Sequence, residues 1–143
     1  MCIRDSAKGA TPAMIEAMDA SSANEEEMKS SLQLIFPLYF YRYHPAYDAL
    51  MADIIVCAAF EEHQEKMLST YNTLLSLHEI GCPTLILVGR DDFICPPSQA
   101  QHMHALIPQS HLVVFEHSGH LPWIEEPSLF NQTVKEWLEQ KEG

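Results

Sequence analysis

Two short apolar runs in the second half of the chain constrain its fold most. The first, Cys82–Val88, ends at Gly89, and the second covers His111–Phe115. Both runs are continuous rather than alternating, which is typical of strands buried on both faces in a parallel sheet. Parallel neighbours need a crossover connection, and a helix predicted over Ser98–Ile107 supplies one. The sequence therefore predicts an α/β unit that follows the order strand, loop, helix, strand, loop, helix.

The first half of the chain predicts helices only. A helix is expected after Thr11, and Asn24 can cap a second one whose first turn is acidic. Further helices are predicted over Tyr47–Ile55 and from about Ala59 to Leu77. No segment of this half alternates with the period of two that a half-buried strand requires.

An aromatic segment, Phe36–Tyr43, interrupts this helical half. It contains three tyrosines and two phenylalanines and is too irregular to assign to one element. Buried aromatic rings mostly serve packing, so we expect core residues here rather than the wall of a substrate pocket.

The acidic composition excludes some functions. The 143 residues carry a formal charge of −12, which repels nucleic acid and anionic membrane surfaces. No apolar stretch is long enough to span a membrane and no signal peptide is visible, so we expect a cytoplasmic protein. Acidic runs usually mark solvated helix faces or first turns, and we expect this of Glu25–Glu27, Glu61–Glu62 and Glu125–Glu126.

Neither the cysteines nor the histidines predict a metal or cofactor site. The four cysteines form no C-x-x-C pair. His102 and His104 are two residues apart and would point in different directions. His117 and His120 are separated by Ser-Gly, which predicts a turn rather than a shared helix face.

One carboxylate and one imidazole follow the two predicted strands. Asp92 lies just after the first strand and His120 just after the second. The carboxyl ends of neighbouring parallel strands share one edge, so these side chains are expected to meet. A carboxylate there would fix the imidazole tautomer and stabilise the imidazolium after proton uptake. The alternatives are an ordinary turn residue for Asp92 and a hydrogen-bonded loop residue for His120.

The motifs around these residues resemble the C-terminal part of the α/β-hydrolase superfamily. They are Gly89-Arg90-Asp91-Asp92 with Pro96, and Ser118-Gly119-His120 with Pro122 and Glu125-Glu126-Pro127. The resemblance implies that Asp92 is the triad acid and His120 the base, in the chain order nucleophile, acid, histidine. It also implies the last two parallel strands with their helices, preceded by a helical cap, and it leaves the N-terminal core strands missing.

The nucleophile that such a triad needs is not visible. None of the five glycines is four residues from another, so the chain has no G-x-S-x-G elbow. Residues 1–6 resemble the translation of a transposon-derived sequencing adapter, and we expect them to be non-native. We expect residues 7–78 to form the helical cap region and residues 79–143 the core portion. The chain alone is therefore expected to be inactive, and the nucleophile's identity as Ser, Asp or Cys stays open.

The resemblance leaves the substrate open between a small molecule and a short peptide. Proline iminopeptidase-like members often place an acidic residue directly after the triad aspartate, where this chain has Phe93. Cap glutamates such as Glu61, Glu62 or Glu65 are alternative holders of an amino group. Esterases and carbon–carbon bond hydrolases fit the same motifs, and Phe93 and Trp123 are the candidate pocket residues. The competing interpretation is a non-catalytic relative that binds a ligand or a protein, and the oligomeric state stays open.

Overall fold

The computed structural model describes residues 9–19, 24–57, 63, 67 and 70–140. The chain divides into two compact units, of which one comprises residues 1–38 and 43–72 and the other residues 39–42 and 73–143. The second unit thus includes a four-residue segment from the first half of the sequence. Within the described ranges, no helix has both the length and the apolar character needed to cross a membrane.

Where it is described, the first unit contains helices and no strand, as predicted. It contains α2 (Pro12–Asp19), α3 (Glu25–Ile35), the 3-10 helix η2 (Pro45–Asp53) and most of the 3-10 turn η1 (Phe36–Tyr39). Asn24 is confirmed as a cap, because its side chain accepts hydrogen bonds from the backbone N–H groups of Glu26 and Glu27. The helix predicted from about Ala59 to Leu77 is wrong toward its end, because residues 71–73 are not helical and a separate 3-10 helix covers Leu74–Glu79. Residues 59–62, 64–66 and 68–69 of that prediction lie outside the described residues.

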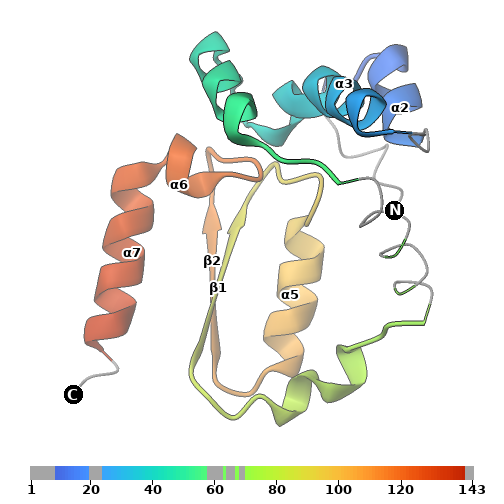
Figure 1. The fold of residues 1–143 in the computed structure, drawn as a ribbon. Helices are drawn as coiled ribbons and strands as arrows, with labels where there is room; N and C mark the ends of the chain where they lie inside the picture. The colour runs from blue at the N-terminus through green and yellow to red at the C-terminus, as the bar shows by residue number, and fades with distance from the viewer. Residues whose placement is uncertain (1–8, 20–23, 58–62, 64–66, 68–69, 141–143) are drawn as a thin grey trace. The chain divides into compact units, whose positions relative to one another are not determined.

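The second unit contains the predicted parallel strands (Figure 1). Its elements are η3 (Leu74–Glu79), β1 (Thr84–Gly89), α5 (Pro97–Leu106), β2 (Ser110–Phe115), α6 (Pro122–Glu125) and α7 (Pro127–Glu139). The strands pair in parallel, with Thr84 opposite Ser110 and Gly89 opposite Phe115. Helix α5 is the crossover, and α5 and α7 lie on opposite sides of the two strands (Figure 1). The short helix α6 was not predicted.

One face of the strand pair forms the apolar core of this unit. Its buried members are Leu77, Ile86, Val88, Ala100 and Ile107, contributed by η3, β1 and α5 and the residue that follows α5. Burying an aliphatic side chain of this size stabilises the fold by about 1.5–3 kcal/mol, so alternate residues of β1 account for much of the packing against α5.

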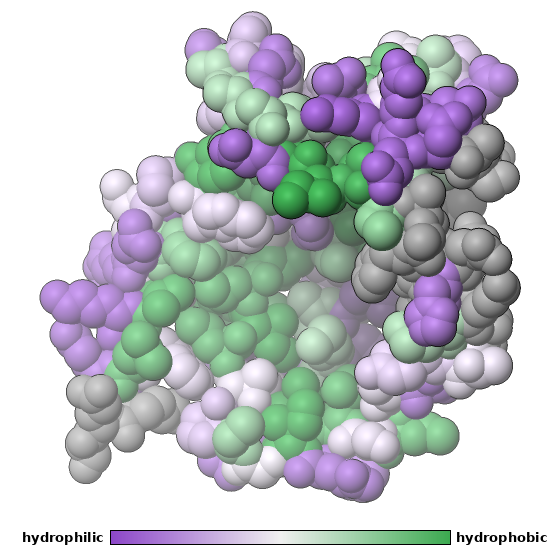
Figure 2. Space-filling view, viewed as in Figure 1, coloured by the Kyte–Doolittle hydropathy of each residue, from purple (hydrophilic) through white to green (hydrophobic). Residues whose placement is uncertain are grey.

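The opposite strand face is less covered than predicted. Leu85, Val113 and Trp137 line a groove of about 310 Å³ between the strands and α7. Figure 2 shows apolar side chains gathered beside α7 in this region. The expectation of burial on both faces is therefore wrong for this side, because α7 is the one described helix on it and does not fill the space. The groove lies toward the amino ends of the strands.

Two glycines allow three backbone segments to approach closely at the opposite end of the strands. A Cβ atom at Gly89 would overlap the backbone carbonyls of Ser118 and Gly119. A Cβ atom at Gly119 would overlap the Tyr39 carbonyl and the backbone of Phe40. Both residues are buried, so no side chain fits at either position.

We expect Gly89→Ala to lower the free energy of unfolding by about 2–3 kcal/mol, because the overlapping atoms are backbone and cannot turn aside. Gly81→Ala is the matched control, since a Cβ there meets no atom within 4 Å and its effect should stay within about 0.5 kcal/mol. Urea unfolding followed by circular dichroism measures both values. Equal midpoints for the two variants would contradict the close approach at Gly89.

Candidate active site

The two loops that carry Asp92 and His120 start side by side because the strand pairing continues past the strands. The Arg90 N–H donates to the Phe115 carbonyl at 2.8 Å, and the Asp91 N–H donates to the Ser118 carbonyl at 3.1 Å. The predicted meeting of the two strand ends is therefore present in the structure. Backbone hydrogen bonds, rather than side chains, set the spacing of the loops.

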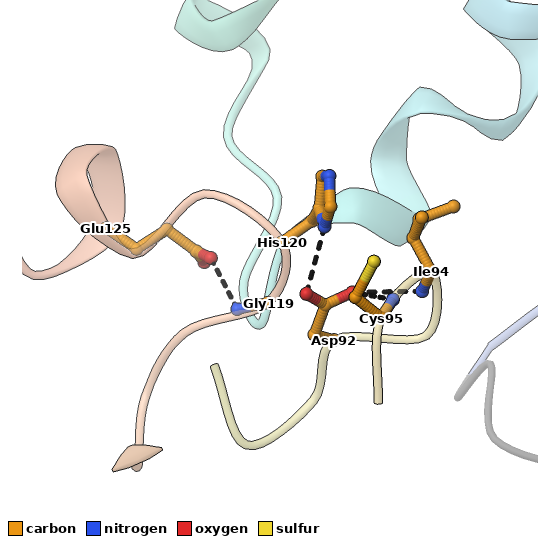
Figure 3. A network of polar contacts seen from close by, with 6 residues as sticks. All are labelled: Asp92, Ile94, Cys95, Gly119, His120 and Glu125. Carbon is orange, nitrogen blue, oxygen red and sulfur yellow. Dashed lines mark hydrogen bonds and ion pairs between the residues drawn. The ribbon is translucent and has the colours of Figure 1, made fainter. Parts of the chain in front are cut away.

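Asp92 is held so that each carboxylate oxygen has a separate role. The side chain is 6% exposed. Its Oδ1 accepts hydrogen bonds of 2.9 Å from the backbone N–H groups of Ile94 and Cys95. These bonds fix the carboxylate on its own loop and leave Oδ2 directed at the second loop (Figure 3).

His120 meets that second oxygen. Its Nδ1 lies 2.9 Å from Asp92 Oδ2, and its side chain is 30% exposed. In neutral imidazole this contact requires a proton on Nδ1, which leaves Nε2 as the acceptor. The second ring nitrogen faces away from Asp92 (Figure 3). This arrangement has the form of a general base with an orienting carboxylate.

Tyr39 was not singled out from the sequence, yet its ring contacts the Asp92–His120 pair. It lies edge-on to His120 and to Phe93, with ring centroids 5.5 Å apart in each case. Burial raises the pKa of the Tyr39 hydroxyl, and the negative charge of Asp92 raises it further. The phenol is therefore neutral at ordinary pH. The only signal in the sequence was the aromatic segment as a whole, of which Phe36 and Phe40 are buried as expected.

The two candidate pocket residues lie in different surroundings. Phe93 is 1% exposed and packs against Tyr39. Trp123, on α6, is half exposed, with its ring edge toward Phe130 on α7. Their assignment to a substrate pocket stays a prediction.

Glu125 lies in the first turn of α6, as one of the two expectations for acidic runs allowed, but the expectation of a solvated acidic face is wrong for Glu125 and Glu126. Glu125 Oε2 accepts from the Gly119 N–H at 2.7 Å, and Glu126 Oε2 accepts from the Ser118 hydroxyl at 2.6 Å. Both side chains are half-buried. Glu25–Glu27 are exposed in the first turn of α3, as predicted, and Glu61–Glu62 lie outside the described residues. Glu125 and Glu126 differ from Glu25–Glu27 because the turn from α6 into α7 directs their carboxylates toward the loop that carries His120.

The surroundings of Glu125 shift its carboxyl toward the neutral form. Burial raises the pKa of this carboxyl above its usual value. Hydrogen bonds from the backbone N–H groups of Gly119, Arg42 and Tyr41 lower the pKa, and the charge of Glu126 raises it. Desolvation is the largest of these contributions to the pKa, and it acts against the charged form of Glu125.

Two other polar side chains near the strand ends do not take part in the pair. Burial and the Asp92 charge raise the pKa of the Cys95 thiol, which lowers its thiolate fraction and makes it a poor nucleophile. Arg90 pairs with Glu116: its Nε donates to Glu116 Oε2 at 2.9 Å and its Nη2 donates to Oε1, and both side chains are exposed. Among the described residues, no three His, Cys, Asp or Glu side chains converge on a metal position.

Comparisons with known proteins match this chain to a protein family and to several hydrolases. The family model described as alpha/beta hydrolase fold matches residues 34–127. A putative carbamate hydrolase, RutD, of Pseudomonas savastanoi pv. phaseolicola is 37% identical over 71 residues, which are 50% of this chain and 27% of that protein. A proline iminopeptidase of Clostridioides difficile is 39% identical over 71 residues, which are 50% of this chain and 24% of that protein.

A solved structure of a thermophilic esterase from Thermogutta terrifontis gives a TM-score of 0.61 at 27% identity. The match covers 94% of this chain and 53% of the esterase chain. The chain thus spans about a quarter of the length of the curated relatives that it matches and about half of this solved structure. Because the family model matches more than half of the chain, and the fold carries the expected parallel strand pair, this chain belongs to the α/β-hydrolase family.

Proposed function

We propose that this chain supplies the general base and its orienting carboxylate for acyl-transfer hydrolysis by a nucleophile, histidine and aspartate triad. The observation that carries the proposal is the 2.9 Å contact between His120 Nδ1 and the buried Asp92 carboxylate. In this mechanism His120 Nε2 takes the proton of the attacking nucleophile and then gives it to the leaving group. Asp92 keeps the ring in the required tautomer and stabilises the imidazolium.

The nucleophile of this mechanism comes from outside these 143 residues, because the chain has no G-x-S-x-G elbow. The limited share of each relative's length that this chain matches agrees with that requirement. The same proposal gives residues 7–78 the role of a cap region. The chain alone is then inactive. A Ser or Cys nucleophile gives its proton to His120 as described, whereas an Asp nucleophile would attack as a carboxylate and His120 would instead take a proton from the hydrolytic water.

An ester is the substrate class that we favour over a peptide with an N-terminal proline. The residue after Asp92 is Phe93, and a buried phenyl ring offers no charge to hold a substrate ammonium group. Glu61, Glu62 and Glu65, the alternative holders of that group, lie outside the described residues. The ester preference therefore rests on Phe93, with the iminopeptidase relative as the specific reason to keep the peptide as second candidate.

The first prediction concerns the His120 tautomer in the 143-residue chain. We expect neutral His120 to carry its proton on Nδ1, and Asp92→Asn to shift the ring toward the Nε2–H form because the charged acceptor is lost. Nitrogen-15 chemical shifts of the imidazole ring measure the tautomer ratio. Asp91→Asn is the matched control and should leave it unchanged. An Nε2–H tautomer in the unsubstituted chain would contradict the proposed base.

The second prediction concerns turnover in the polypeptide encoded by the genomic reading frame extended upstream of codon 7. We expect Asp92→Asn to lower kcat for p-nitrophenyl butyrate by about 10⁴-fold, and His120→Ala to cause a loss of similar size. Asp91→Asn should retain activity. The 143-residue chain alone should hydrolyse the ester no faster than buffer. Absence of turnover in the extended polypeptide would favour the non-catalytic binding alternative.

The third prediction separates the two substrate classes. With the same extended polypeptide, we expect a higher kcat/KM for p-nitrophenyl butyrate than for proline p-nitroanilide, because position 93 carries no charge for the amino group. The two rates are compared spectrophotometrically through the released chromophores. A preference for the proline substrate would assign the amino group to acidic residues elsewhere, with Glu61, Glu62 and Glu65 as the first to substitute.

A further inference from the structure

The loop that carries His120 is irregular, and the backbone N–H groups of Gly119 and His120 hold it in place. The Gly119 N–H donates to Glu125 Oε2 at 2.7 Å (Figure 3). The His120 N–H donates to the Tyr39 carbonyl at 2.6 Å. The backbone position of the histidine therefore depends on two partners that lie outside its own loop.

Those two partners are themselves connected. Residues 39–42 form a segment, here called the strap, that belongs to the same compact unit as the histidine loop. Glu125 Oε1 accepts from the Arg42 N–H at the end of the strap, at 3.1 Å. The Glu125 carboxylate thus links Gly119 to the strap, and the Tyr39 carbonyl of the same strap accepts the hydrogen bond from the His120 N–H.

The neighbouring carboxylate has a different set of donors. Glu126 Oε2 accepts from the His117 N–H at 3.0 Å and from the Ser118 hydroxyl at 2.6 Å. Ser118 is fully buried. Glu126 therefore holds the first half of the loop, and Glu125 holds the half that leads directly into His120.

We propose that Glu125 is a positioning residue for His120, acting by tying the Gly119–His120 backbone to the strap. A carboxylate suits this role because each oxygen accepts from a different backbone N–H, whereas a glutamine offers one acceptor and turns its amide donors toward the other N–H. This inference rests on the proposed function, in which His120 is the base.

Two further observations support a positioning role over a purely stabilising one. Glu125 is half-buried, so its carboxyl gives up solvation to accept these backbone hydrogen bonds, and this burial raises its pKa. The Gly119 backbone meets the strap so closely that a Cβ atom would overlap it, and any slip of the loop would be transmitted to the His120 ring. Small displacements of a base are costly, since about 1 Å of misplacement lowers a rate by about 10²-fold.

The test uses the isotope-labelled 143-residue chain with Glu125→Ala and Glu125→Gln, and with Glu126→Ala and Glu139→Ala as controls. Amide hydrogen exchange and imidazole nitrogen-15 shifts are measured by NMR. We expect Glu125→Ala to speed exchange of the Gly119 and Arg42 amides at least about tenfold and to move the His120 tautomer ratio away from the Nδ1–H form. Glu125→Gln should restore part of both signals.

The controls separate positioning from general destabilisation. Glu126→Ala should act on the His117 amide and leave the Arg42 amide protected. Glu139→Ala, which removes an exposed partner of Lys135 on α7, should change neither signal. Unchanged exchange at Val88 in β1 shows that the unit remains folded, and a variant that loses this protection is replaced by Glu125→Gln.

The outcome that would overturn the proposal is faster Gly119 exchange in Glu125→Ala with an unchanged His120 tautomer, because Glu125 would then stabilise the loop without positioning the ring. An equal tautomer change in Glu139→Ala would overturn it as well. Failure of the proposed function is recognised separately, by an Nε2–H tautomer in the unsubstituted chain or by absence of ester turnover in the extended polypeptide.

Discussion

The parallel pairing of β1 with β2 is the constraint on which the site depends. Because the register sets Gly89 opposite Phe115, both strands end at the same level and their following loops leave the sheet together. Backbone hydrogen bonds continue from Arg90 and Asp91 into the second loop, so the spacing between the loops is fixed before any side chain takes part. The contact between Asp92 and His120 is a consequence of that register.

Beyond the strands, the site is held mainly by carboxylates that accept from backbone N–H groups. Asp92 binds two such groups on its own loop, and Glu125 binds the Gly119 N–H of the histidine loop and backbone N–H groups of the strap, among them that of Arg42. Bonds of this kind are charge-assisted and directional, which suits segments without regular structure. Gly89 and Gly119 add to this, because without side chains they permit the close backbone approach on which these bonds depend.

Local patterns in the sequence were sufficient for the two strands, for the helix between them and for the contact between Asp92 and His120. The apolar runs predicted both strands, and Asp92 and His120 followed from their distance after each strand. The role of Glu125 was not predictable, because an acidic pair at a helix start has the same local pattern whether it faces solvent or a backbone donor. Tyr39 was also missed as a neighbour of His120, since its contacts join segments far apart in the sequence.

The sequence by itself determined the order of the two strands and the helix between them, and the placement of Asp92 and His120 after the strands, because apolar periodicity and the position of a residue after a strand are local properties. The tertiary structure alone decided which face of the strands is fully covered, which backbone segment lies against His120, and which carboxylates hold its loop. These depend on contacts between residues distant in the chain, such as Arg42 with Glu125, for which the local sequence carries no periodic signal.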